Sequence, residues 1–217
     1  MTNAYRCLPL LGLLLGACTA PPTQPTDSSA AGPTVPPVAA RVADESDLAF
    51  LQPAADAPPL AATQVSFWAV KGQDRRVSLY YHARPGATDS SELVRFRVDK
   101  RSLRRRPDGR SFATGDSILI TITIVDAQRL IVDFQPSGLT FDQKYPARLW
   151  FKWTETEDDL NGDHVVDTAD DAIRLTSAIW GQETVGGPWT ALATEFDLAS
   201  QEVEAKPTSF TRYAVAY

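Results

Sequence analysis

The chain has 217 residues, of which 43% are hydrophobic and 22% charged, a balance typical of a globular protein of one or two domains. Its formal net charge of −6 argues against a general nucleic-acid-binding protein, which would carry a basic domain. Both cysteines, Cys7 and Cys18, lie at the N-terminus, so the rest of the sequence offers no disulfide framework, thiolate metal site or cysteine nucleophile.

The N-terminus has the pattern of a signal peptide. Residues 7–15 form an apolar stretch that is too short to span a bilayer as a helix, which needs about 20 residues. The stretch ends in Leu15-Gly16-Ala17-Cys18, which resembles the lipobox of bacterial lipoproteins. The resemblance implies cleavage after residues 1–17 and a lipid anchor on Cys18; an ordinary secretory signal is the alternative. The residue after the cysteine is Thr19 and not Asp, which by the usual sorting pattern of bacterial lipoproteins implies the outer membrane of a double-membraned bacterium.

Residues 18–63 are expected to form a disordered tether. Residues 19–63 contain nine of the sixteen prolines and one aromatic residue, Phe50. Such a segment buries too little apolar surface to offset its ordering entropy, and proline keeps it extended. A short helix over residues 46–52, docked on the following domain, is the one element expected here.

Residues 64–217 are predicted to form an antiparallel β-sandwich, with a barrel as the alternative. The clearest strand covers residues 117–125, because its isoleucines alternate with polar residues. The next strand, residues 129–134, follows after a short turn and predicts a hairpin. Short strands without βα alternation favour a sandwich. The other predicted strands are residues 65–70, 77–82, 93–98, 147–153, 201–206 and 211–217.

Three segments of this region resemble the ZU-five domain, a module of zonula occludens proteins, Unc-five proteins and ankyrins. They are Phe-Arg-Val-Asp-Lys-Arg-Ser-Leu from Phe96, Ser-Gly-Leu-Thr-Phe from Ser137 with a following Pro-Ala-Arg-Leu from Pro146, and Phe-Thr-Arg-Tyr-Ala-Val from Phe210. In the first segment, residues 99–102 replace the Pro and Gly of the family pattern. The resemblance implies a protein-interaction module rather than an enzyme.

The most specific chemical motif is the twelve-residue segment 159–170. Its side-chain oxygens fall at the spacing with which EF-hand loops surround calcium, a hard cation that takes six to eight oxygen ligands. The pattern resembles the loop of dockerins and other EF-hand-like proteins, although His164 stands at the sixth position, where positive φ favours glycine. The predicted calcium ligands are Asp159, Asn161, Asp163, the carbonyl group of Val165, Asp167 and Asp170.

An acidic surface loop without an ion is the alternative interpretation. Residues 155–171 contain eight acidic side chains and no Lys or Arg, a concentration of like charge that favours a bound cation. A helix is expected next, capped by Thr168 and ended by Gly181, with its inner face formed by Ala172, Leu175 and Ile179. Loop and helix would form an insertion, residues 155–181. Dockerins carry two such loops, so the single copy argues against a cohesin-binding dockerin.

A second charged feature is the basic stretch, residues 95–110, which contains eight Arg and Lys residues. It could bind phosphates of lipopolysaccharide, an anionic membrane or an acidic partner. The favoured alternative is a solvated hairpin that faces the acidic loop of the same chain. The candidate anion-binding residues are Arg101, Arg104, Arg105 and Arg106.

No motif for catalysis is present. The two histidines, His82 and His164, lie in no nucleophile-elbow or zinc-protease pattern. Trp150 is expected to point away from the core. It would then either contact a sugar or a protein or be covered by a helix over residues 169–180, and the second interpretation is favoured.

The sequence therefore predicts a lipid-anchored, non-catalytic domain of the bacterial cell envelope that serves interaction or structural support and contains one structural calcium ion. The first alternative is an envelope carbohydrate-binding module that uses Trp150 as its platform. A hydrolase with paired carboxylates is a third hypothesis. The expected partners are the membrane, through the lipid, and a protein or polysaccharide, but no nucleic acid.

Overall fold

The computed structural model describes residues 41–217, which lie within one compact unit, Pro37–Tyr217. The predicted signal peptide, the lipidation site Cys18 and the first part of the predicted tether lie outside the described residues. Among the described residues, no helix is long and apolar enough to cross a membrane.

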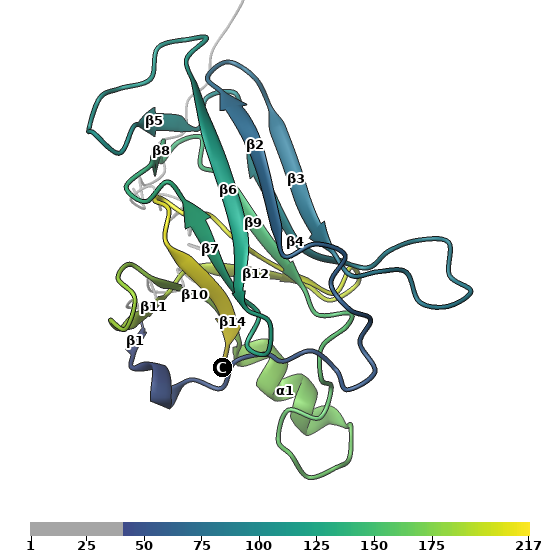
Figure 1. The fold of residues 1–217 in the computed structure, drawn as a ribbon. Helices are drawn as coiled ribbons and strands as arrows, with labels where there is room; N and C mark the ends of the chain where they lie inside the picture. The colour runs from purple at the N-terminus through teal and green to yellow at the C-terminus, as the bar shows by residue number, and fades with distance from the viewer. Residues whose placement is uncertain (1–40) are drawn as a thin grey trace, which may run out of the picture. The chain divides into compact units, whose positions relative to one another are not determined.

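Two antiparallel sheets face each other (Figure 1). In spatial order, the seven-stranded sheet contains β1 (Val42–Ala43), β11 (Trp189–Ala191), β10 (Ala178–Gln182), β14 (Arg212–Ala216), β7 (Ile131–Gln135), β6 (Ser117–Asp126) and β2 (Gln64–Val70). The five-stranded sheet contains β12 (Thr194–Asp197), β13 (Glu202–Ala205), β9 (Arg148–Lys152), β4 (Glu92–Val98) and β3 (Arg75–Tyr80). A small third sheet pairs β5 (Leu103–Arg105) with β8 (Thr140–Phe141). The predicted antiparallel β-sandwich is confirmed.

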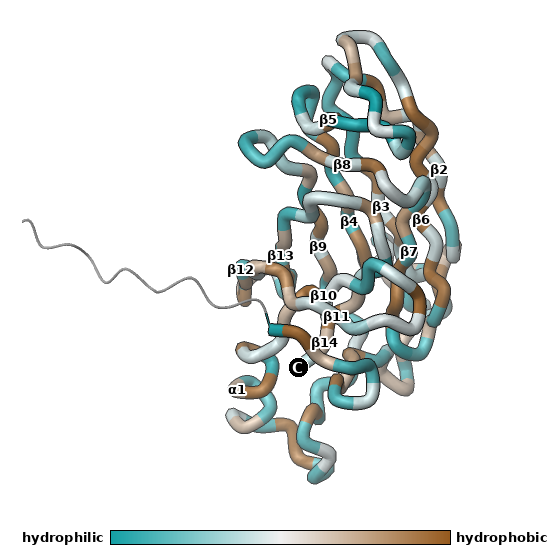
Figure 2. The backbone as a smooth tube through the Cα atoms, turned by 90° about the vertical axis from the view of Figure 1, so that its left-hand side faces the viewer, coloured by the Kyte–Doolittle hydropathy of each residue, from teal (hydrophilic) through white to brown (hydrophobic). Residues whose placement is uncertain are grey.

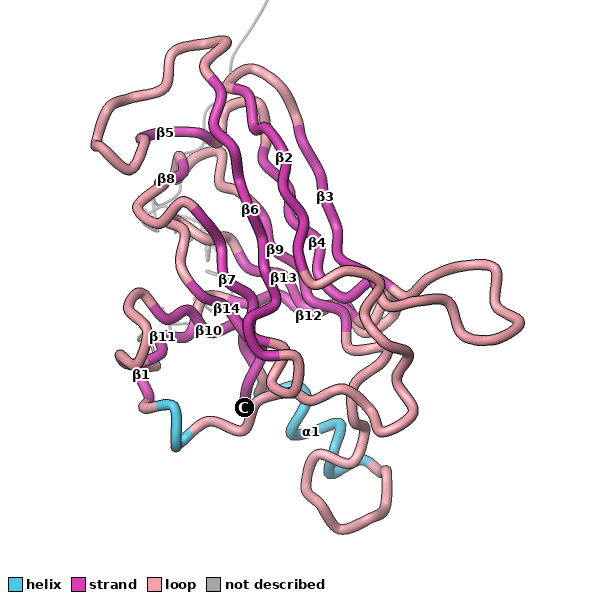
Figure 3. The backbone as a smooth tube through the Cα atoms, viewed as in Figure 1, coloured by secondary structure: helices cyan, strands magenta, loops and turns pink. Residues whose placement is uncertain are grey.

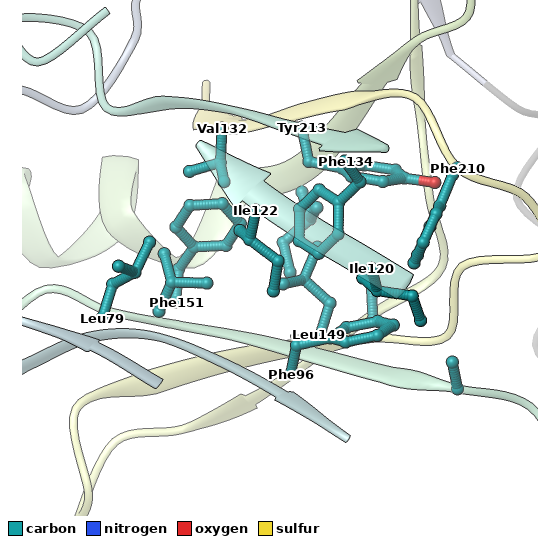
Figure 4. Packing of buried hydrophobic residues seen from close by; sticks show 14 of the residues in the cluster. Leu79, Phe96, Ile120, Ile122, Val132, Phe134, Leu149, Phe151, Phe210 and Tyr213 are labelled. Carbon is teal, nitrogen blue, oxygen red and sulfur yellow. The ribbon is translucent and has the colours of Figure 1, made fainter. Parts of the chain in front are cut away.

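The main core fills the space between the two large sheets (Figure 4). Successive side chains of a strand point to opposite faces, so alternate residues enter this space. Ile120, Ile122 and Phe134 enter from the seven-stranded sheet, and Phe96 and Leu149 enter from the other sheet. Figure 2 shows the corresponding hydrophobic segments along the strands, whereas the outer loops are mainly hydrophilic.

An aromatic cluster in this core joins three segments that lie far apart in the sequence and contain Phe96, Phe141 and Phe210. The ring centroid of Phe96 lies 6.1 Å from that of Phe141 and 5.6 Å from that of Phe210, and the latter two rings are 5.1 Å apart. Phe134 of β7 completes the cluster at 5.1 Å from Phe96. Tilted and edge-to-face rings at these distances add to the stabilisation from burial.

The domain begins earlier than the predicted boundary at residue 64. β1 pairs with β11, and Ala49 and Leu51 form backbone hydrogen bonds with residues 215–217 beside β14. In place of the helix predicted over residues 46–52 there is one 3-10 turn, η1 (Glu45–Asp47), followed by extended chain (Figure 3). The prediction of a disordered tether is therefore wrong for residues 41–63, since Phe50 and Leu51 are buried.

A second hydrophobic cluster covers the part of the outer face of the seven-stranded sheet that is formed mainly by β10, β11 and β14. Phe50 packs edge-to-face against Trp189, with ring centroids 5.3 Å apart, and Trp180 of β10 lies in the same cluster. Glu45 accepts a hydrogen bond from the Trp189 indole at 3.3 Å and pairs with Arg129, whose hydrogen bond lowers the pKa of the Glu45 carboxyl. Residues 41–51 therefore form part of the folded domain.

The connection from β9 to β10 carries the chain from the five-stranded sheet to the seven-stranded sheet. It contains the one α-helix of the described residues, α1 (Thr168–Thr176). The predicted insertion, residues 155–181, extends too far, because residues 178–181 belong to the buried strand β10 and Gly181 does not end the helix. Ile179, which the sequence places on the inner face of a longer helix, lies in β10.

Candidate calcium loop and cationic sheet face

The loop 159–170 leads into α1, whose first turn contains the last three residues of the loop, at the opposite end of the sandwich from the β2–β3 turn (Figure 1). Asp167 is the N-cap of α1: its side chain accepts a hydrogen bond from the backbone N–H of Ala169 at 2.7 Å. Asp170 forms the other half of a capping box by accepting from the backbone N–H of Asp167 at 2.9 Å. The predicted cap at Thr168 is thus wrong by one residue, since the carboxylate of Asp167 satisfies the free N–H groups better.

Asp170 joins the two ends of the loop. One carboxylate oxygen accepts hydrogen bonds from the backbone N–H groups of Leu160 and Asn161, at 2.7 and 3.2 Å, while the other accepts from Asp167. These backbone donors, with that of Asp167 foremost, lower the pKa of the Asp170 carboxyl. The carboxylate is therefore held ionised within a loop that it also closes.

The first half of the loop is wound around Asp159. Its side chain accepts hydrogen bonds from the backbone N–H of Gly162 at 2.7 Å and of His164 at 2.8 Å. His164 has a φ of 68°, in the left-handed region that the sixth residue of such a loop adopts. Asn161 and Asp163 accept from N–H groups two residues further on. Each predicted side-chain ligand therefore accepts a hydrogen bond from a backbone N–H group of the same loop.

Three acidic residues that directly precede this loop have partners outside it. Glu155 is buried and binds Arg84 at 2.5 Å, and Asp158 binds Arg174 of α1 at 2.8 Å. Glu157 accepts a hydrogen bond from the backbone N–H of Ala55 at 2.9 Å. The charge concentration that needs an ion is therefore smaller than the sequence suggests, and it is confined to the loop and the start of α1.

The donor chemistry fits a calcium ion, because each predicted ligand is an oxygen. Within residues 41–217, however, no three His, Cys, Asp or Glu side chains converge closely enough to hold a metal ion. The carboxylates point instead to N–H groups of their own loop. Ion binding therefore requires these side chains to rotate towards a common centre while the loop backbone stays closed.

The inner face of α1 differs from the predicted one. Ala172 and Leu175 are exposed, whereas Asp170 and Arg174 are buried. Arg174 lies over the ring of Trp153, with its guanidinium carbon 5.8 Å from the ring centroid. A cation–π contact and an ion pair thus hold the helix against the sandwich, and the apolar pattern of the sequence does not reveal either contact.

The basic stretch does not form one patch. Arg106 turns back to Asp116 at 3.1 Å and lies over Phe112, whereas Arg104 and Arg105 are exposed on β5. Arg101 alone of the four candidates joins another basic surface, on the five-stranded sheet. The predicted pairing of this stretch with the acidic loop is also wrong: among the described residues, its ion pairs go to carboxylates outside that loop, such as Asp108, Asp116 and Glu202.

The outer face of the five-stranded sheet carries the basic residues that sequence reasoning missed. Arg76 of β3 lies opposite Arg97 of β4, and Arg97 lies opposite Arg148 of β9. Their spacing in the sequence gives no hint of this row, because only the strand register brings them together. We call these three residues the arginine row.

Trp150 lies beside the arginine row on the same outer face. It is only 8% exposed and is covered by Arg95, whose guanidinium carbon is 5.0 Å from the ring centroid. The prediction that α1 covers it is wrong, since α1 packs on Trp153. The exposed tryptophan of the described domain is Trp68 of β2, at 60%.

These features define an antiparallel β-sandwich domain with an acidic twelve-residue loop in one crossover and a cationic outer face on its smaller sheet. No family model matches the chain, and neither the curated proteins nor the solved structures contain a match to it.

Proposed function

We propose that this protein is a non-catalytic interaction or support domain of the bacterial cell envelope, anchored by a lipid on Cys18 and stabilised by one calcium ion. The observation that carries the calcium proposal is the closed loop 159–170, whose ends are joined by the buried Asp170 and whose sixth residue has positive φ. A site of the extracellular type, with a Kd of about 10⁻⁴ to 10⁻³ M, would be filled outside the cell.

The residues that would hold the ion are those of the predicted ligand set, from Asp159 to Asp170, with the Val165 carbonyl group. The ion would offset the repulsion among the loop carboxylates and would fix the crossover that connects the two sheets. Because an ion that binds only the folded state shifts the unfolding equilibrium, calcium is expected to stabilise the whole domain.

Thermal unfolding of the full chain tests this role. At a calcium concentration 100 times Kd the stabilisation is about 2.7 kcal/mol, which corresponds to a rise in Tm of roughly 5–10 °C over the chelated protein. Asp159→Ala should abolish the rise. Asp89→Ala, which removes an exposed carboxylate outside the loop, should preserve it. An equal calcium response in both variants would rule out this loop as the site.

The lipid anchor rests on the sequence around Cys18. Growth with a clickable palmitate analogue should label the wild-type chain, and Cys18→Ser should remove the label and release the protein from the membrane fraction. Retention of the label in Cys18→Ser would contradict the proposed anchor.

Trp150 does not provide an open platform for a sugar ring, because Arg95 covers it. A carbohydrate-binding module that depends on stacking against Trp150 therefore has no support from the geometry. The arginine row on the same outer face of the five-stranded sheet could instead bind a ligand through its positive charge.

A further inference from the structure

The arginine row crosses three neighbouring strands of the five-stranded sheet. The side chains of Arg76, Arg97 and Arg148 remain 60%, 46% and 47% exposed. Adjacent strands are about 4.8 Å apart, so the row spans roughly 10 Å. Like charges directly opposite each other destabilise an antiparallel sheet. The row therefore has an energetic cost that a bound anion would reverse.

The carboxylates nearest to the row neutralise it weakly. Arg76 lies 3.7 Å from Glu92, Arg97 lies 3.5 Å from Asp74, and Arg148 lies 3.4 Å from Glu204. Charge-assisted hydrogen bonds between guanidinium and carboxylate groups are typically about 2.7–2.9 Å long. The three arginines thus keep donors free for an additional anion.

Arg95, which lies two residues before Arg97 in β4 and on the same face, differs from the arginine row. It contacts Glu202 at 2.5 Å and Glu92 at 2.9 Å, and its side chain is only 15% exposed. This residue is already paired and covers Trp150. The available positive charge is therefore concentrated in the arginine row.

Two hollows flank Arg97, which lines both of them. The first, of about 370 Å³, is lined by three further arginines, including Arg76, and by one carboxylate, Asp74. The second, of about 220 Å³, is lined by Arg148, Arg101, Lys144 and Asp99. A linear chain with repeated anionic groups can place one group in each hollow.

We propose that the arginine row and its two hollows bind an anionic polysaccharide through the carboxylate, sulfate or phosphate groups on its sugars. Guanidinium groups bind each of these anions through paired hydrogen bonds. The apolar lining of the hollows is limited to the covered ring of Trp150 in one and to Tyr145 and Pro146 in the other, whereas the core of a protein interface and an interfacial membrane site both require broad apolar contacts. A flexible polyanion needs only charge and hydrogen bonds.

This inference rests on the proposed interaction role and names the partner class. It does not depend on calcium, because the loop 159–170 lies at the other end of the sandwich (Figure 1). A failed calcium test would therefore leave it standing, and a failed polysaccharide test would leave the calcium site standing.

The experiment measures binding of the full chain to dextran sulfate, with uncharged dextran as the matched control. Wild type should bind dextran sulfate in a salt-sensitive manner and should not bind dextran. Arg76→Gln/Arg148→Gln should weaken binding at least about tenfold, since each arginine supplies charge-assisted hydrogen bonds. Arg104→Gln/Arg105→Gln changes the net charge equally but lies on β5, and it should weaken binding less than about twofold.

Thermal unfolding of the same variants adds a stability readout. Removal of the opposed charges should offset the loss of the long ion pairs to Glu92 and Glu204, so the Tm of Arg76→Gln/Arg148→Gln should stay close to that of wild type. Equal loss of binding in both double variants would overturn the proposal, since net charge would then explain binding. Preference for polyglutamate, oligothymidylate or phosphatidylglycerol vesicles over dextran sulfate would also overturn it.

Discussion

Deletion of residues 41–63 is expected to unfold the domain or to leave it unstable at 37 °C. The deletion removes β1, the buried side chains of Phe50 and Leu51, and the hydrogen bonds that extend β14. Truncation of a buried Phe costs about 3–5 kcal/mol and of a buried Leu about 2–5 kcal/mol. Their sum is comparable to the whole stability of a typical domain, about 5–15 kcal/mol.

Urea unfolding followed by circular dichroism measures this effect. Phe50→Ala alone should lower the free energy of unfolding by about 3–5 kcal/mol. Val42→Ala should change it by less than about 1 kcal/mol, because Val42 is exposed in the same segment. If the deletion variant unfolded at the wild-type urea concentration, residues 41–63 would not belong to the folded domain.

Phe210→Ala is expected to lower the free energy of unfolding by about 3–5 kcal/mol. Phe210 is buried and packs against Phe96, Phe134 and Phe141, so its removal leaves a cavity where both large sheets meet (Figure 4). Leu119→Ala serves as the control, because this side chain lies on the outer face of β6 and is partly exposed.

Chemical denaturation of both variants separates the two positions. The expected loss for Leu119→Ala is below about 1 kcal/mol. Similar losses in the two variants would show that the segments around Phe96, Phe141 and Phe210 do not meet in one tightly packed cluster.

The strands of the sandwich could be predicted because their alternation records which face is buried. In β6 the isoleucines point to the core and the threonines to the outside, a pattern that depends only on neighbouring residues. The segment 41–63 lacks such a pattern. Its few apolar residues become informative only when β10, β11 and β14 provide a surface for them.

The candidate sites also differ in whether the sequence alone predicts them. The loop 159–170 could be predicted because its oxygen-bearing residues lie within one continuous stretch. The arginine row could not, because Arg76, Arg97 and Arg148 come from three strands and meet only through their register. The end of α1 could not be predicted from the sequence, because Ala178, Ile179 and Trp180 suit a buried strand as well as a helix.

Direct calcium titration by isothermal calorimetry tests the central claim most directly. The full chain, freed of metal, should bind one calcium ion with a Kd of about 10⁻⁴ to 10⁻³ M, and Asp159→Ala should bind none. Absence of binding to the wild-type chain at calcium concentrations well above that range would contradict the claim. The loop would then be an acidic turn that is held closed by its own side-chain to backbone hydrogen bonds.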